Sequence, residues 1–287
     1  MKLIALLFGL ATPWAADYAT DPEMLERFGQ PFEPFHIAGN VYYVGAHEVS
    51  SFLIDTGAGL IVIDGGFFET GPMIEANMKQ LGFDVADIRI LLNSHAHFDH
   101  AAGLAYLQER SGAEVIAMRG DARTLATGDG QFAEFPAVQV NRVIDDGATV
   151  SLGETTLTAI ATPGHTPGCT TWTATITTEE GPRRAVFLCS LSALSVYNLI
   201  DDQDYPDIAA DYRFTFAKLE DLEVDIFLAA HGSFFNLEEK AQRRREGAGE
   251  AVFIDPIGFA NFVADSKARF EALLARQQAE RRKNEPN

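Results

Sequence analysis

The sequence has few cysteines, few basic residues and no long apolar run after its N-terminal segment, and each of these shortages argues against a particular class of protein. Its two cysteines, Cys169 and Cys189, form no CxxC pair, so a structural zinc site built from thiolates is not indicated. Lys and Arg number 22 against 41 Asp and Glu. The resulting net charge of −19 repels phosphate backbones, which argues against a nucleic-acid partner. After the N-terminal segment, no apolar run is long enough to span a membrane.

Linkers, low-complexity tracts and repeats are also absent, which favours one continuous domain. Short β-branched runs, such as GLIVIDGG and DIRILLNS, alternate with segments of helical spacing. Two groups of strands separated by helices predict an α/β domain over residues 20–287, with two facing sheets and helices outside. The predicted helices are residues 70–81, 101–111, 207–222 and 258–282.

The first 19 residues differ from the rest of the chain. Lys2 supplies a positive charge, residues 3–10 form a short apolar run, and small residues follow. This pattern resembles a secretory signal peptide, and the run is too short to cross a bilayer as a stable helix. We therefore predict that the protein is periplasmic or secreted, with a docked or disordered N-terminal helix as the alternative.

The two cysteines flank a predicted hairpin, residues 170–188, at similar distances from its turn. They can therefore face each other across two strands. An oxidising compartment would allow a disulfide between them, whereas two buried free thiols are an equal alternative.

Histidine is scarce, at seven residues, yet three of the seven lie within six positions of the segment NSHAHFDHAAG, residues 93–103. His95 and His97 are two apart, so in an extended segment both side chains lie on one side and can reach a single metal ion. Asp99 and His100 follow as the chain turns into a helix, and can serve a second metal ion close by. Imidazole and carboxylate ligands suit zinc.

Two further histidines follow predicted strands. His165 lies in the loop PGHTPG, and His231 directly follows the strand in VDIFLAAHG. A ligand at the end of a buried strand is well placed to complete a preorganised site. His36 and His47 have no such context and are predicted to be ordinary surface or core residues.

Together these motifs resemble those of the metallo-β-lactamase superfamily and, within it, the third subclass of class B β-lactamases. The resemblance runs from residues 34–46 through the histidine cluster and PGHTPG to the strand that ends at His231. It implies the αβ/βα sandwich, with metal ions at one edge of two facing mixed sheets. It also implies two zinc ions per chain, one bound by His95, His97 and His165 and the other by Asp99, His100 and His231.

The segment CSLSALSVYNL, residues 189–199, bears on the reaction. In glyoxalase II and lactonase relatives, an aspartate after this strand bridges both metal ions, whereas this chain has Ser190 there and no acidic residue before Asp201. The first subclass of class B uses a cysteine ligand in this region. Cys189 lies one position early, and strand alternation would turn it to the opposite side, so we interpret it as a packing residue.

The resemblance therefore implies hydrolysis of the β-lactam amide of antibiotics by a metal-activated hydroxide, which confers antibiotic resistance. Asp99 would orient the nucleophile besides binding metal. Ser190 and Ser192 would bind the substrate carboxylate or a zinc-bound water, and Tyr197 would approach the scissile amide, with capping or packing as the alternative for each.

Two questions stay open at the level of sequence. An acyl-homoserine lactonase, or another dinuclear-zinc hydrolase of the same superfamily, is the alternative function. Asp64 is expected either to accept a hydrogen bond from a zinc-bound histidine or to form a turn before two glycines.

Overall fold

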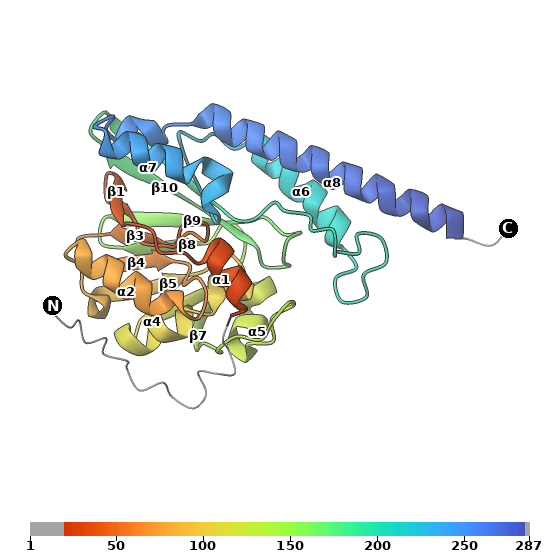
Figure 1. Ribbon diagram of the computed structural model, residues 1–287, viewed down its shortest axis with the longest axis horizontal. Helices are drawn as coiled ribbons and strands as arrows, with labels where there is room; N and C mark the ends of the chain where they lie inside the picture. Colours follow the sequence, from red (N-terminus) through yellow and green to blue (C-terminus); the bar gives the residue numbers. More distant parts are fainter. Residues whose placement is uncertain (1–19, 285–287) are drawn as a thin grey trace, which may run out of the picture.

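The computed structural model describes residues 20–284. Two β-sheets pack face to face and helices cover both outer faces, which gives four layers (Figure 1). This arrangement confirms the predicted αβ/βα sandwich. The predicted signal peptide, residues 1–19, lies outside the described residues. Between residues 20 and 284, no helix combines the length and the apolar character needed to cross a bilayer.

The first sheet has seven strands in the order β1 to β7. Strands β1 to β4 pair antiparallel and β4 to β7 pair in parallel, so the sheet is mixed, as predicted. The strands are β1 (Phe35–Ala38), β2 (Val41–Tyr43), β3 (Phe52–Asp55), β4 (Leu60–Ile63), β5 (Ile88–Leu92), β6 (Glu114–Met118) and β7 (Val140–Ile144).

The second sheet has five strands in the order β12-β11-β10-β9-β8. Only β11 and β12 pair in parallel, and the other neighbours are antiparallel. The strands are β8 (Thr149–Leu152), β9 (Thr155–Ala161), β10 (Thr170–Thr178), β11 (Gly181–Leu188) and β12 (Ile226–Ala229).

Helices form the two outer layers (Figure 1). On the first sheet lie α2 (Thr70–Gln80), α4 (Leu104–Ser111) and α5 (Arg119–Thr127), and on the second lie α6 (Ile208–Glu220), α7 (Leu237–Arg245) and α8 (Pro256–Asn284). Shorter elements are α1 (Pro22–Phe28), α3 (Phe98–Ala101) and the 3-10 turns η2 (Val85–Asp87), η3 (Gly232–Phe235) and η4 (Glu250–Phe253).

Strand β4 explains why both faces of the first sheet must be covered. Its side chains alternate, so Ile61 and Ile63 join the core between the sheets, while Leu60 and Val62 join the core beneath α2, α4 and α5. All four are buried. A strand that is apolar on both sides is typical of the parallel part of a sheet, which needs helices on one face and a second layer on the other.

The predicted helices are present, with α2 ending at Gln80 and α4 beginning at Leu104 after the separate short helix α3. Sequence periodicity does not predict α5 or α7. The first, RGDARTLAT, buries only Ala122 and Leu125 as apolar side chains, and the second, LEEKAQRRR, is almost entirely charged. Packing against the rest of the fold stabilises both helices, so their own pattern is weak.

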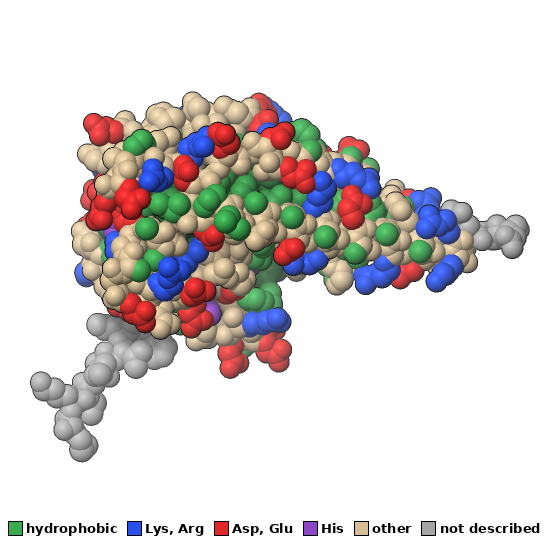
Figure 2. Space-filling view, turned by 90° about the horizontal axis from the view of Figure 1, so that it is seen from above, with side chains coloured by type: hydrophobic (Ala, Val, Ile, Leu, Met, Phe, Trp, Pro, Cys, Tyr) green, Lys and Arg blue, Asp and Glu red, His purple; other side chains and the backbone are tan. Residues whose placement is uncertain are grey.

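Helix α8 reaches beyond the sandwich, and its last turns carry Lys and Arg side chains (Figures 1 and 2). Its C-terminal part holds the loop that follows β11. The side-chain amide of Gln277 donates to the carbonyl of Tyr197 at 2.7 Å and accepts from the backbone N–H of Leu199 at 2.8 Å. The segment that carries the predicted substrate contacts is therefore fixed from outside the metal cluster.

Candidate metal centre

The predicted ligands meet where strands of both sheets end. Residues 95–100 follow β5 of the first sheet, His165 lies in the loop between β9 and β10 of the second, and His231 follows β12. The backbone N–H of Thr170 donates to the carbonyl of Ser94 at 2.7 Å and joins the two sheets here. Chain segments far apart in sequence therefore contribute to one site.

The first group consists of His95, His97 and His165, all buried. One ring nitrogen from each lies within 4.8 Å of those of the others. Their ring centroids are 4.6–4.8 Å apart. Nε2 of His95 is buried and has no hydrogen-bond partner in the described part of the chain, which is costly for a polar atom. A metal ion shared by the three rings would remove that cost.

The second group consists of Asp99, His100 and His231. Nε2 of His100 lies 3.2 Å from Nε2 of His231 and 3.3 Å from Oδ2 of Asp99, and the His231–Asp99 separation is 3.8 Å. The ring of His95 lies 4.2 Å from that of His100, so the two groups adjoin. All six predicted ligands therefore form one continuous cluster.

In most of these histidines, the ring nitrogen that faces away from the cluster contacts another residue. Nδ1 of His100 donates to Asp64 at 3.1 Å, and Nδ1 of His165 donates to the carbonyl of Ser192 at 2.8 Å. Nδ1 of His231 faces Glu48 at 3.6 Å. These contacts leave Nε2 directed into the cluster, as the ligands of metalloproteins require. His97 differs, because its Nε2 lies 3.4 Å from Gln131 and leaves Nδ1 for the cluster.

Asp64 combines a hydrogen bond to His100, a predicted ligand, with a backbone conformation that is common in turns. Its φ of 66° is left-handed, directly after the end of β4. Its carboxylate accepts from the backbone N–H and the hydroxyl of Ser94, both at 2.6 Å, and from His100. The Ser94 hydroxyl in turn accepts from Nδ1 of His95 at 3.0 Å. One buried carboxylate therefore orients a histidine in each group.

Burial makes the first group neutral. It lowers the pKa of His95 and His165 well below the usual value, and the charges of neighbouring histidines lower both further. Burial also lowers the pKa of His97 to about 4. Neutral imidazole is the form that binds a metal ion.

In the second group, the positive charge of His100 and the negative charge of Asp99 stabilise each other. Burial opposes protonation of His100, but the charge of Asp99 and the hydrogen bond to Asp64 raise its pKa to about 10. Burial alone would raise the pKa of Asp99, but the charge of His100 and its hydrogen bond hold that pKa well below the usual range. Asp99 is therefore an ionised carboxylate, the form that binds a cation. With the neutral imidazoles of the first group, the unpartnered Nε2 of His95 and the ionised carboxylate of Asp99, the cluster is a histidine-rich metal-binding site that fits zinc.

The cysteines are bonded to each other, with Cα atoms 6.0 Å apart. Of the two alternatives that the sequence left open, a disulfide or two buried free thiols, the structure has the disulfide. Sγ of Cys189 lies 3.7 Å from Nδ1 of His95, on the side of the ring away from the unpartnered Nε2. This position agrees with the interpretation of Cys189 as a packing residue.

The predicted substrate contacts lie on the loop after β11, beside the first group. Ser190 and Ser192 line the cavity above the histidines. Tyr197 is not among the cavity-lining residues; it is buried, and its hydroxyl donates to the carbonyl of His165 at 2.9 Å. Its observed contact supports His165, and a contact with the scissile amide stays a prediction.

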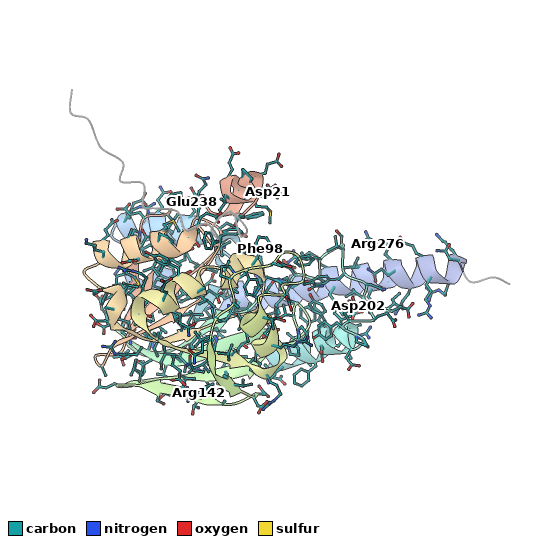
Figure 3. The ribbon with its side chains drawn as sticks, turned by 90° about the horizontal axis from the view of Figure 1, so that it is seen from below. Asp21, Phe98, Arg142, Asp202, Glu238 and Arg276 are labelled. Atoms are coloured by element: carbon teal, nitrogen blue, oxygen red, sulfur yellow. A yellow bond between two sulfur atoms is a disulfide. The ribbon has the colours of Figure 1, made fainter. Side chains whose placement is uncertain are left out.

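A cavity of about 640 Å³ opens over the cluster, beside α1 and the start of α3, where Phe98 lies in the view from below (Figure 3). His97, Asp99, His165 and His231 line it, and none of the described Lys or Arg residues does. Its apolar walls include Phe28, Phe98, Phe132, Leu194, Val196 and Phe234. The cavity therefore suits a small molecule with apolar substituents.

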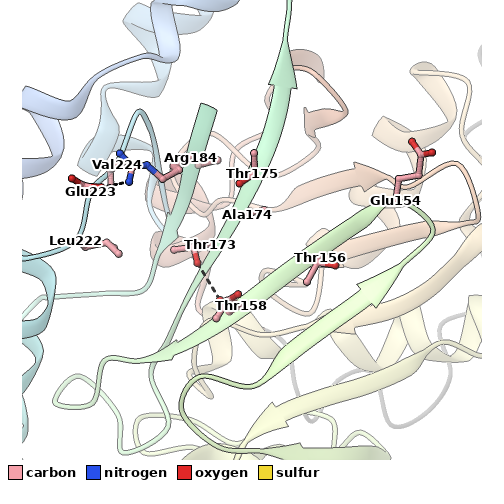
Figure 4. A pocket seen from close by; sticks show the side chains of 11 residues that line it. Glu154, Thr156, Thr158, Thr173, Ala174, Thr175, Arg184, Leu222, Glu223 and Val224 are labelled. Carbon is pink, nitrogen blue, oxygen red and sulfur yellow. Dashed lines mark hydrogen bonds and ion pairs between the residues drawn. The ribbon is translucent and has the colours of Figure 1, made fainter. Parts of the chain in front are cut away.

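A second hollow, of about 430 Å³, lies on the outer face of the second sheet (Figure 4). Threonines of β9 and β10 line it, together with the ion pair of Arg184 and Glu223. It contains none of the predicted ligands or substrate contacts. The cavity over the histidines is therefore the candidate site.

Comparison with known proteins agrees with this geometry. A family model described as the metallo-β-lactamase superfamily matches residues 44–178. The native metallo-β-lactamase FEZ-1 from Legionella gormanii is 38% identical with a TM-score of 0.84, and the match covers 87% of this chain and 98% of that one. This chain belongs to the metallo-β-lactamase superfamily.

Other members of the superfamily are also similar. BJP-1, a subclass B3 metallo-β-lactamase of Bradyrhizobium japonicum, is 36% identical with a TM-score of 0.84 over 90% of this chain and 99% of that one. A probable metallo-hydrolase of Burkholderia pseudomallei is 32% identical over 44% of this chain and 48% of its own length. Human acyl-coenzyme A thioesterase MBLAC2 is 29% identical over 72% of this chain and 78% of its own.

The match to the first curated relatives is partial. It spans about half of the Burkholderia protein, and 35% of a hydroxyacylglutathione hydrolase from Rhodospirillum rubrum that is 33% identical over 37% of this chain. The similarity to these relatives therefore supports the assignment to the superfamily and the presence of a metal site, but does not favour any one substrate.

Sequence reasoning missed several residues around the ligands. Glu48 beside His231, Gln131 beside His97 and Asp121 on α5 each contact the cluster or its loops. No local motif marks them, because each meets the site only through the tertiary fold.

The neutral state of His97 predicts a pH dependence of stability. Its pKa of about 4 when folded lies below the value of about 6.5 for an unfolded chain, so the unfolded state takes up the proton first as pH falls. In chelator, the free energy of unfolding should therefore fall between pH 6.5 and pH 4. His97 contributes a slope of up to about 1.4 kcal/mol per pH unit.

Urea unfolding at several pH values measures this slope. His97→Gln should show a shallower decline than the parent chain, while His47→Gln, outside the cluster, controls for the substitution. Equal slopes for His97→Gln and the parent would contradict a neutral, buried His97.

Proposed function

We propose that this chain is a dinuclear zinc hydrolase that opens the β-lactam ring of antibiotics. The observation that carries the proposal is a cluster of six zinc-type ligands beneath a cavity lined by Ser190, the position at which bridging relatives would carry an aspartate. Likeness to β-lactamases over nearly their whole length supports the same conclusion.

Each ion would have three protein ligands. His95, His97 and His165 would hold the first, and Asp99, His100 and His231 the second. When bound, zinc would supply a water molecule of lowered pKa and a Lewis acid for the carbonyl oxygen of the substrate. Three protein ligands per ion would match the number found in catalytic zinc sites.

The surrounding residues would position the reactants. Asp99 is ionised and lines the cavity, so it can accept a hydrogen bond from the attacking water and orient it. The hydroxyls of Ser190 and Ser192 can donate to the substrate carboxylate, and within residues 20–284 no Lys or Arg lines the cavity to compete for this role. The apolar walls would contact the side chain of the antibiotic and exclude water.

A lactonase or thioesterase activity is the second candidate. The similarity to an acyl-coenzyme A thioesterase over most of both chains favours it, and the apolar walls would also accommodate an acyl chain. The ligand set would serve either reaction, because it activates water and does not itself select the bond that breaks.

Turnover of three substrates separates these functions. We expect the zinc-loaded protein to hydrolyse a chromogenic cephalosporin with a kcat/KM at least tenfold above that for an acyl-homoserine lactone or an acyl-coenzyme A thioester. Chelator and His165→Ala should abolish all activity, which shows that the metal site is responsible. Preferred turnover of the lactone or thioester would reject the β-lactamase assignment and leave the metal hydrolase intact.

Ser190 tests the absence of a bridging ligand. Ser190→Ala should leave metal content unchanged and lower kcat/KM roughly threefold to tenfold, the effect of one neutral hydrogen bond. Ser190→Asp adds a carboxylate beside the cluster, so it should bind zinc more tightly and hydrolyse the cephalosporin more slowly. Zinc loss in Ser190→Ala, measured by elemental analysis, would mean that Ser190 is a ligand.

We also propose that the protein is exported and that residues 20–287 form its single mature domain. The disulfide between Cys169 and Cys189 supports this, because such bonds persist in oxidising compartments. Mass spectrometry of the chain from its native host should give the mass of a chain that begins near residues 16–20 and is two hydrogen atoms lighter than the dithiol. An intact Met1 with free thiols would contradict export.

A further inference from the structure

Asp121 is a buried carboxylate that has no part in the ligand set. It lies in the first turn of α5 and is only 3% exposed. Its Oδ2 accepts from the backbone N–H of Ala96 at 2.8 Å and from the hydroxyl of Thr166 at 2.7 Å. Its Oδ1 accepts from the backbone N–H of Gly168 at 2.7 Å. Both oxygens therefore accept hydrogen bonds.

These partners belong to the two segments that carry the first group of ligands. Ala96 lies between His95 and His97, on the segment that leaves the first sheet after β5. Thr166 directly follows His165, on the loop between β9 and β10 of the second sheet. One carboxylate thus joins the backbone of two histidines to the loop of the third.

The start of α5 also packs directly on the His165 loop. A Cβ on Gly120 would lie 2.5 Å from the backbone nitrogen of Gly168, and a Cβ on Gly168 would lie 2.6 Å from the carboxyl carbon of Asp121. Both distances are shorter than real Cβ contacts, so only glycine allows this approach. The helix and the loop meet backbone to backbone, and Asp121 has little freedom to move.

We propose that Asp121 is a positioning residue that sets the separation of His95 and His97 from His165 and so determines the metal affinity of the first group. The proposal rests on the metal centre described under the proposed function. It is independent of Asp64, whose carboxylate accepts from Ser94 and His100 on the other side of the cluster.

Replacement by the isosteric amide tests this role. Asp121→Asn keeps the shape but supplies only one acceptor oxygen, and its NH2 group faces a donor whichever way the amide turns. At least one link between the two loops is therefore lost. Residues that orient metal ligands typically change metal affinity 10- to 100-fold when mutated, and we expect a loss of that size for zinc bound by the first group.

Glu250 offers a matched control. It is also buried, at 8% exposure, and its carboxylate accepts from the backbone N–H groups of Gly39 at 2.9 Å and Glu179 at 3.0 Å, with no predicted ligand among these partners. Glu250→Gln makes the same chemical change. We expect both variants to lower the melting temperature in chelator, and only Asp121→Asn to weaken metal binding.

A milder variant keeps the test valid if Asp121→Asn does not fold. Thr166→Val removes one of the three hydrogen bonds and leaves the carboxylate in place. It should weaken metal binding roughly threefold to tenfold.

The experiment titrates the full-length protein and its variants with zinc against a chromogenic chelator, and repeats the titration with Co²⁺ to record its visible spectrum. The proposal expects weaker binding of one ion and a shifted cobalt spectrum in Asp121→Asn and Thr166→Val, with Glu250→Gln like the parent. Parental affinity and spectrum in Thr166→Val and in folded Asp121→Asn would overturn it. A parent chain that binds no metal would instead overturn the metal centre itself, together with this inference.

Discussion

Five imidazoles and one carboxylate share a small buried volume where the two sheets meet. Buried imidazoles cannot all carry protons at such short distances, and Nε2 of His95 has no hydrogen-bond partner among residues 20–284. A cation that accepts lone pairs from several rings resolves both problems together. The loops, the helix starts and the cavity all adjoin the place where this cation would bind. The chemistry that we propose depends on that cation.

The fold positions the imidazole rings for a shared cation through contacts on the side of each ring that faces away from the cluster. Strands of both sheets end at the same edge, so the ligands arrive on short loops whose backbones are already fixed. Asp64, Glu48 and the carbonyl of Ser192 then orient individual rings, while Asp121 ties one loop to another. Three of these four contacts come from carboxylates, a strong hydrogen-bond acceptor that can bind two or more donors at once.

The sequence predicts which side chains the fold brings together at the cluster, because five histidines and Asp99 lie in motifs whose spacing and strand-end context carry the signal. It also predicts the sandwich, since apolar runs such as β4 bury both faces. It does not predict α5, or the meeting of Asp121 with Ala96 and Gly168, because those contacts depend on how distant segments pack. The pairing of Cys169 with Cys189 is likewise settled only by the register of β10 and β11. Local sequence patterns predict strands, helices and motifs. Tertiary packing decides which distant residues contact the ligands and hold them in place.

Crystallography of the zinc-saturated protein, with anomalous difference maps at the zinc edge, tests the central claim most directly. The account predicts two strong peaks per chain, one among His95, His97 and His165 and the other among Asp99, His100 and His231. A single peak at saturating zinc, or peaks that leave any of these six side chains unbound, would contradict it.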